Sequence, residues 1–174
     1  YEWTKMRKGE SYYYLGIIFT ICSFYSIYLI RDLNNNYINF FFILSVCVST
    51  DIGGYVFGKI FKGPKLTSIS PNKTYAGLFG SFILTILSTI IIFEKGFFFQ
   101  LETNVTYLTY LLAIIISIIS QIGDILISYF KRLSNIKDTG NIIPGHGGLL
   151  DRADGIIFAF PFTYLILSTS TINF

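Results

Sequence analysis

Five long apolar stretches alternate with short polar segments along the 174 residues of the chain. Each stretch approaches the roughly 20 apolar residues that a helix needs to cross a bilayer. Their apolar residues run on without the strict alternation of a half-buried strand, which favours helices. The sequence therefore predicts an all-α, polytopic integral membrane helix bundle with about five transmembrane helices, near residues 12–30, 37–57, 76–93, 105–127 and 155–174.

The composition supports a membrane-embedded chain. Hydrophobic residues make up 52% of the sequence and charged residues only 13%, whereas a soluble domain typically carries about 25% charged residues. So few charges exclude an ordinary soluble globule, and the apolar content excludes a disordered chain. We see no internal repeat and no soluble segment, and therefore interpret residues 1–174 as a single membrane-embedded domain.

Lysine and arginine are distributed unevenly between the polar segments. Eleven of the 13 lie in the N-terminal tail and in the segments 58–75 and 128–154, while Arg31 and Lys95 lie in the alternate turns. The side with more bases faces the cytoplasm in most membrane proteins. We therefore expect a multi-pass protein of the inner (plasma) membrane, with cytoplasmic loops at 58–75 and 128–154 and no nucleic-acid partner.

Glycines gather in the two windows 51–80 and 123–155, which hold 12 of the 15. Glycine permits close backbone approach and exposed amide donors, which a phosphate-binding pocket requires and a lipid-facing helix does not. In the first window, Asp51 and Tyr55 share a helical face with two glycines, although Gly54 and Gly58 could instead pack two helices together.

Hydroxyl groups and an amine precede the third apolar stretch, at Ser70, Lys73 and Thr74. This pattern is typical of a helix N-cap, and it also suits an anion site at a helix N-terminus. The two interpretations are compatible with each other.

A polar stripe crosses the fourth apolar stretch, because Ser117, Gln121, Asp124 and Ser128 follow helical spacing. Inside a membrane such a stripe faces the bundle interior or a wet cavity. Asp124 is therefore a candidate functional residue, with a buried ion pair to a loop arginine as the alternative.

Bases and acids interleave in the second window, where four of each occur: Lys131, Arg132, Lys137, Arg152, Asp124, Asp138, Asp151 and Asp154. Bases alone could fix topology or anchor lipid headgroups, but these acids need another explanation. Carboxylates that hold Mg²⁺ beside cations that hold phosphates provide one. The only histidine, His146, lies in the same window within a glycine-rich loop, which favours a functional role.

These motifs resemble those of the phosphatidate cytidylyltransferase family. The downstream signature is matched at Ser128, Lys131, Arg132, Lys137, Asp138, His146, Gly147, Gly148, Asp151, Arg152 and Asp154. The upstream pattern is matched at Asp51, Gly53, Tyr55, Gly58, Lys59, Ser70, Pro71, Lys73, Thr74 and Gly77, and Glu2-Trp3 is similar to the family's Glu-Trp before a span. The chain departs from common family residues at Ala76, Ile127 and Asn141. The likeness covers essentially the whole chain, and one or more N-terminal spans are expected to be missing from it.

The resemblance implies transfer of the cytidylyl group of CTP to phosphatidic acid, giving CDP-diacylglycerol and pyrophosphate in phospholipid synthesis. It implies Mg²⁺ held by Asp124 and Asp151, and leaves open a second cation such as K⁺ and a homodimer. The implied catalytic residues are Asp124, Lys131, Arg132, Lys137, Asp138, His146, Asp151, Arg152 and Asp154. The implied substrate-binding residues are Asp51, Tyr55, Lys59, Ser70, Lys73, Thr74, Ser128, Gly147 and Gly148.

Two other functions stay open at this point. The first is a related membrane enzyme that uses CTP to phosphorylate a lipid alcohol. The second is an ion transporter or channel with Asp51 and Asp124 as intramembrane ligands. A channel needs polar groups along a through-path, whereas the polar residues here crowd one face, which argues against it.

Overall fold

The computed structural model describes residues 2–3, 10–32, 37–67, 70, 73–93, 107–140 and 147–169. Its elements confirm the all-α prediction. In chain order, the helices are α1 (Glu10–Asp32), α2 (Ile38–Phe61), α3 (Tyr75–Phe93), α4 (Tyr107–Leu133) and α5 (Leu150–Thr169).

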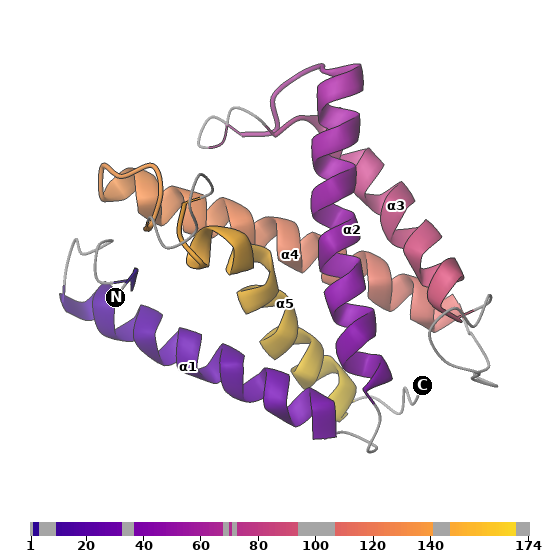
Figure 1. The fold of residues 1–174 in the computed structure, drawn as a ribbon, viewed down its shortest axis with the longest axis horizontal. Helices are drawn as coiled ribbons and strands as arrows, with labels where there is room; N and C mark the ends of the chain where they lie inside the picture. Colours follow the sequence, from indigo (N-terminus) through magenta and orange to yellow (C-terminus); the bar gives the residue numbers. More distant parts are fainter. Residues whose placement is uncertain are drawn as a thin grey trace.

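The helices form two groups, α2 with α3 and α1 with α5, and α4 contacts both groups. Figure 1 shows α2 and α3 as an antiparallel pair, α4 crossing behind them, and α5 between α1 and α2. The most extensive contacts join α2 to α3 and α4 to α5, and α1 packs mainly on α5. Large apolar side chains fill the bundle between them, with Phe42, Ile116 and Phe160 almost fully buried.

Three of the described helices, α2, α3 and α4, are long and apolar enough to cross a membrane. This finding confirms three of the five predicted spans. The other two helices are more polar, since α1 contains five tyrosines and both of its ends are charged. The first five residues of α5 include Asp151, Arg152 and Asp154, and α5 ends at Thr169, inside the predicted span 155–174.

Two helices continue beyond the apolar stretches that predicted them. α2 runs on to Phe61 and carries Lys59, and α4 runs on to Leu133 and carries Lys131 and Arg132. Charged residues with good helix propensity extend a helix into water as readily as apolar ones. The polar segments that separate these helices from α3 and α5 are therefore shorter than the predicted loops 58–75 and 128–154.

The α2–α3 pair depends on glycines that let the backbones touch. A Cβ atom at Gly53 would lie 2.6 Å from the Gly80 carbonyl oxygen, and one at Gly77 would lie 2.6 Å from that of Gly54. A Cβ atom at Gly54 itself would meet nothing within 4 Å. The close packing expected from small residues thus rests on Gly53, Gly77 and Gly80. Of the pair named from the sequence, Gly54 contributes its carbonyl to this contact, and Gly58 faces the start of α3, where a Cβ atom would lie 3.2 Å from the Thr74 hydroxyl oxygen.

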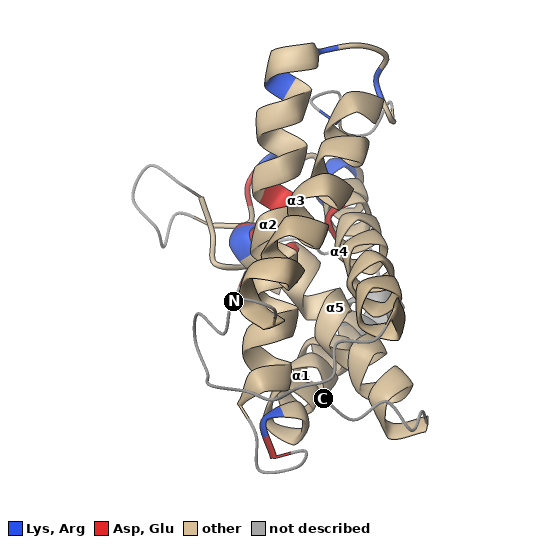
Figure 2. Cartoon of the chain, turned by 90° about the vertical axis from the view of Figure 1, so that its right-hand side faces the viewer, with Lys and Arg blue, Asp and Glu red and all other residues tan. Residues whose placement is uncertain are grey.

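Charged residues gather at one end of the bundle. Figure 2 shows most described acids and bases in the upper half of the view, around the ends of α2, α3 and α4. A separate ion pair between Arg31 and Asp32 closes α1 at the other end, with 3.8 Å between nitrogen and oxygen. The charge asymmetry along the sequence is therefore an asymmetry in space as well.

Candidate functional site

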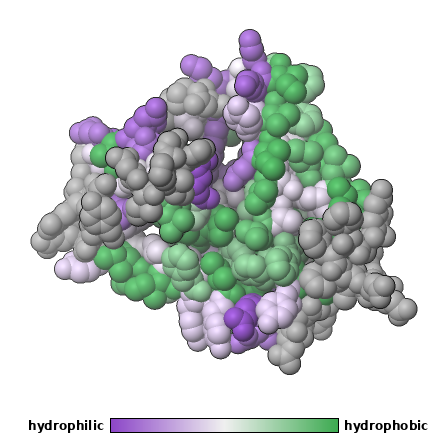
Figure 3. Space-filling view, in the orientation of Figure 1, coloured by the Kyte–Doolittle hydropathy of each residue, from purple (hydrophilic) through white to green (hydrophobic). Residues whose placement is uncertain are grey.

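A polar cavity of about 500 Å³ opens at the charged end of the bundle. Figure 3 shows hydrophilic residues gathered around a hollow beside the hydrophobic surface of α2. Helices α2, α3, α4 and α5 all contribute to it, as do the α2–α3 and α4–α5 connections. The cavity is lined by Thr50, Asp51, Gly54, Tyr55, Leu66, Ser70, Lys73, Thr74, Gly77, Leu78, Gln121, Asp124, Lys131, Asp138, Asp151, Arg152 and Asp154.

Most residues predicted for the site from the sequence meet in this cavity, although they come from two separate segments, 51–74 and 124–154. Those among its lining are Asp51, Tyr55, Ser70, Lys73, Thr74, Asp124, Lys131, Asp138, Asp151, Arg152 and Asp154. The other predicted residues that the structure describes do not line it. Arg132 and Lys137 are exposed outside the lining, and His146 lies outside the described residues.

Three predicted residues outside the lining form hydrogen bonds with residues that line the cavity. Lys59 donates a hydrogen bond to the Tyr55 hydroxyl over 3.3 Å, and Ser128 donates one to Asp124 over 3.4 Å. The backbone N–H of Gly148 donates to Asp151 over 2.9 Å.

Thr74 is the N-cap of α3. Its hydroxyl oxygen accepts a hydrogen bond from the Gly77 N–H over 3.1 Å, which satisfies one of the free amides at the helix start. Thr74 also lines the cavity. The structure therefore supports the capping interpretation and leaves an anion site at the same position compatible with it.

Asp124 is paired with a base from the other connection. Lys73 forms an ion pair with the Asp124 carboxylate and also donates to the Gln121 carbonyl oxygen over 3.4 Å. The sequence suggested a loop arginine as the structural partner of Asp124, and the structure shows a loop lysine at this carboxylate. This contact joins the two glycine-rich windows across the cavity.

The polar stripe of α4 extends from the cavity lining into the bundle through hydrogen bonds between hydroxyl groups and an amide. The Gln121 side chain donates to the Ser81 hydroxyl over 2.7 Å, and Thr50 donates to Ser117 over 2.8 Å. The stripe thus faces the bundle interior, as predicted. Its partners on α2 and α3, Thr50 and Ser81, were not singled out from the sequence because single hydroxyls in apolar stretches carry no distinctive spacing.

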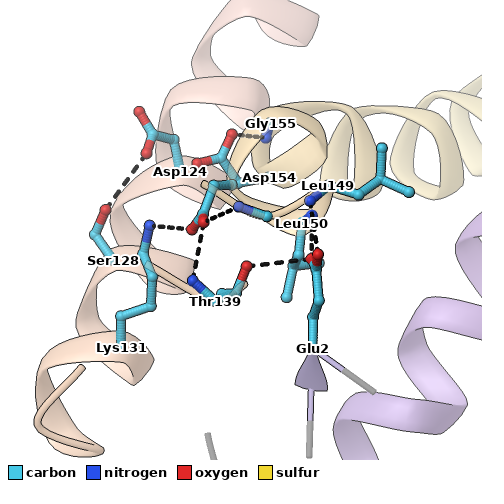
Figure 4. Close-up of polar contacts among 11 residues, drawn as sticks. Glu2, Asp124, Ser128, Lys131, Thr139, Leu149, Leu150, Asp154 and Gly155 are labelled. Carbon is cyan, nitrogen blue, oxygen red and sulfur yellow. Dashed lines mark hydrogen bonds and ion pairs between the residues drawn. The ribbon is translucent and has the colours of Figure 1, made fainter. Parts of the chain in front are cut away.

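Asp151 is held by three donors at the start of α5 (Figure 4). Lys131 donates to one oxygen over 2.9 Å, and the N–H groups of Thr139 and Gly148 each donate to the other over 2.9 Å. Burial raises the pKa of Asp151, but these three hydrogen bonds outweigh it and hold the pKa below its usual value. Asp151 is therefore ionised at neutral pH and braces the α4–α5 connection.

Asp154 lies one turn further along and has a different environment. It is buried, and it accepts a hydrogen bond from the Gly155 N–H over 2.9 Å. Burial and then the neighbouring Asp124 charge raise the pKa of Asp154 above its usual value. Two neighbouring carboxyls favour a shared proton or a bound cation over two bare charges.

These carboxylates fit a hard divalent cation only in pairs. Within the ranges that the structure describes, no three His, Cys, Asp or Glu side chains converge as a protein-only metal site requires. Mg²⁺ does not need such a cage, because it keeps several waters and binds through one or two carboxylates together with substrate phosphates. The donor set around Asp124 suits an ion of this kind that arrives with a phosphate compound.

Known proteins are similar in sequence to this chain across nearly its whole length. The Cytidylyltransferase family matches residues 3–170. A phosphatidate cytidylyltransferase of Staphylococcus haemolyticus is 39% identical over 155 residues, covering 88% of this chain and 55% of that protein. That of Rickettsia bellii is 40% identical over 173 residues, covering 95% and 73%, and that of Bacillus subtilis is 38% identical over 157 residues, covering 88% and 56%. The chain thus spans little more than half the length of several of the curated relatives it matches.

Proposed function

The chain belongs to the phosphatidate cytidylyltransferase family, and from that premise we propose that it transfers the cytidylyl group of CTP to phosphatidic acid. The products are CDP-diacylglycerol and pyrophosphate. The observation that carries the proposal is the cavity at the charged end, where acids and bases from two distant segments meet. Such a set suits a reaction between two phosphate compounds.

The proposed reaction forms one phosphorus–oxygen bond and breaks another. An oxygen of the lipid phosphate attacks the α-phosphorus of CTP, and the bridging oxygen to the β-phosphorus leaves with its electron pair as pyrophosphate. Because the nucleophile is already an anion, the site needs no strong general base. Catalysis then consists mainly of positioning and charge neutralisation.

Basic residues of the cavity are proposed to bind the phosphates. Lys73, Lys131 and Arg152 line it from three different parts of the fold. Lys73 and Lys131 are each paired with a carboxylate, so an incoming phosphate would replace that carboxylate as the partner of the ammonium group. Arg132 and Lys137, which are exposed outside the lining, are proposed contacts for the lipid phosphate.

Asp124 and Asp151 are proposed to hold Mg²⁺, with Asp154 next to Asp124 as a supporting carboxylate. The bound ion would neutralise phosphate charge. Asp151 would have to release Lys131 to take part, which would also free that lysine for a phosphate.

We further propose that all five helices span the membrane and that the cavity faces the cytoplasm. The positions of the bases support this orientation. Lys73 and Lys131 line the cavity, and Lys59 bonds to Tyr55 of its lining. Arg31 lies in the last turn of α1, at the other end of the bundle. The acyl chains of phosphatidic acid would then stay in the lipid while its phosphate enters from the membrane surface.

The full-length protein, purified with and without Mg²⁺, tests the proposal. Given radiolabelled CTP and phosphatidic acid, it is expected to release pyrophosphate and form CDP-diacylglycerol only when Mg²⁺ is present. Release of CDP and a phosphorylated lipid would instead indicate a lipid-alcohol kinase. Ion flux in liposomes without CTP, and no nucleotide chemistry, would support a transporter.

A further inference from the structure

A buried glutamate contacts the start of α5 from the opposite part of the chain. Glu2 is only 9% exposed, and its carboxylate accepts hydrogen bonds from the N–H groups of Leu149 over 2.8 Å and Leu150 over 2.6 Å. These amides stand at the first turn, where no carbonyl of the helix can accept from them. A carboxylate there also complements the positive end of the helix dipole. Glu2 therefore caps α5 across 148 sequence positions.

Glu2 and Asp151 both accept hydrogen bonds from the α4–α5 connection. Thr139 donates its hydroxyl to Glu2 over 3.2 Å and its N–H to Asp151 over 2.9 Å. Gly148 donates its N–H to Asp151, and a Cβ atom there would lie 2.7 Å from the Glu2 carboxyl carbon. Figure 4 shows Thr139 between Lys131 on one side and Glu2 on the other. The two carboxylates thus hold Thr139 together with the residues just before α5.

The residue after Glu2 anchors it. The Trp3 ring lies 6.1 Å from that of Phe130 on α4 and belongs to the apolar cluster around Leu150 and Ile157 on α5. It also lies directly against Gly16 of α1, where a side chain would collide with it. Glu2 is therefore held in place by packing on three helices, which reduces the entropy lost when its carboxylate is ordered.

We propose that Glu2 is a positioning residue of the active site, an inference that rests on the proposed function. By holding the amides of Leu149 and Leu150, its carboxylate fixes the first turn of α5. That turn carries Asp151 and Asp154 into the cavity. A displacement of about 1 Å in catalytic groups can reduce turnover on the order of 100-fold, so loss of the cap should act on turnover. Glu2 itself does not line the cavity, so its proposed role is to position other residues.

Substitution of Glu2 in the full-length enzyme tests this role. Glu2→Gln keeps the size of the side chain but presents an NH₂ group to N–H donors. We expect kcat to fall roughly 10- to 100-fold with little change in KM for CTP. Hydrogen exchange should speed up at residues 147–155 and stay unchanged in α2 and α3. Glu2→Asp, which keeps the charge, should recover part of both losses. The matched control is Asp32→Asn at the exposed end of α1, which should change neither readout.

Several results would overturn the inference. One is wild-type kcat and wild-type exchange in Glu2→Gln, and another is a faster exchange in every helix, which would mean general destabilisation. If the Glu2→Gln protein does not accumulate, Thr139→Val tests the role in its place, because it removes only the hydroxyl that donates a hydrogen bond to Glu2. It is expected to lower kcat several-fold with the same local rise in exchange, and wild-type values for both would refute the role. The exchange readout needs no substrate, so failure of the proposed function is seen separately, as absence of CDP-diacylglycerol from the unaltered enzyme.

Discussion

Two aspartates three positions apart show how strongly local contacts decide the role of a residue. Asp151 accepts three hydrogen bonds and keeps a depressed pKa, while Asp154 is buried against Asp124 and has a raised one. Replacement by asparagine should therefore lower stability at Asp151 and not at Asp154. Spacing alone places both on one helical face and does not distinguish them.

Asp151→Asn should reduce both activity and stability. Its amide offers one acceptor oxygen in place of two, so hydrogen bonds worth roughly 1.5–3 kcal/mol each to a charged group are weakened or lost. We expect formation of CDP-diacylglycerol to fall at least about 100-fold and the unfolding temperature in detergent to drop. Near-normal turnover would contradict the proposed role in the reaction.

Asp154→Asn should reduce activity without reducing stability. The change removes one of two carboxyls that repel each other when both are ionised. The unfolding temperature should therefore equal or exceed that of the unaltered protein, while product formation falls. A clear drop in unfolding temperature would show that Asp154 is needed for the fold instead.

The depressed pKa of Asp151 also predicts a dependence on pH. A carboxylate with a lowered pKa in the folded state stabilises that state above its unfolded pKa of about 3.9, and the contribution is lost as the pH falls through the folded value. The difference in unfolding temperature between the unaltered protein and Asp151→Asn should thus be full at pH 7 and shrink below about pH 4. A constant difference across this range would mean that the charge of Asp151 adds nothing.

At the scale of the helices, contacts between backbones determine which substitutions are tolerated. The α2–α3 pair approaches through Gly53, Gly77 and Gly80, where an added methyl group would meet backbone atoms or the base of the Phe57 side chain, which have no room to move. Gly54 is adjacent in sequence but points its missing side chain into open space.

Gly53→Ala and Gly54→Ala therefore form a matched pair. We expect Gly53→Ala to separate α2 from α3 and to lower stability by about 1–3 kcal/mol, as overpacking does. Gly54→Ala should be neutral or stabilising by up to about 1 kcal/mol, because alanine favours a helix more than glycine does. Thermal unfolding in detergent measures both, and equal effects would contradict the close backbone approach of the two helices at Gly53.

At the scale of the whole molecule, the sequence predicted the helices and most of the residues that line the cavity, but not the contacts between distant residues. Apolar length was enough to predict α2, α3 and α4, and the interrupting Asp51 and Asp124 do line the cavity. The helix ends were missed because Lys59 and Lys131 are as compatible with helix as the residues before them. The Glu2 cap was missed because its partners lie 148 positions away, and no local pattern encodes such a contact.

The orientation of the bundle can be tested with single cysteines. In a background with Cys22 and Cys47 replaced by serine, Lys65→Cys at the cavity end should react with a membrane-impermeant thiol reagent only from the cytoplasm. Asp32→Cys at the other end should react only from outside. Labelling of both from the same side would refute the proposed topology.

The contact between Glu2 and α5 has a consequence for biosynthesis. A ribosome makes Glu2 long before Leu149 and Leu150, so during translation the carboxylate must wait until almost all of the described helices have been made. Until then Glu2 has no helix to cap, and the cavity lacks the residues that α5 contributes to it. A nascent chain stalled before α5 would therefore contain every base of the first glycine-rich window, but its site would lack Asp151, Arg152 and Asp154.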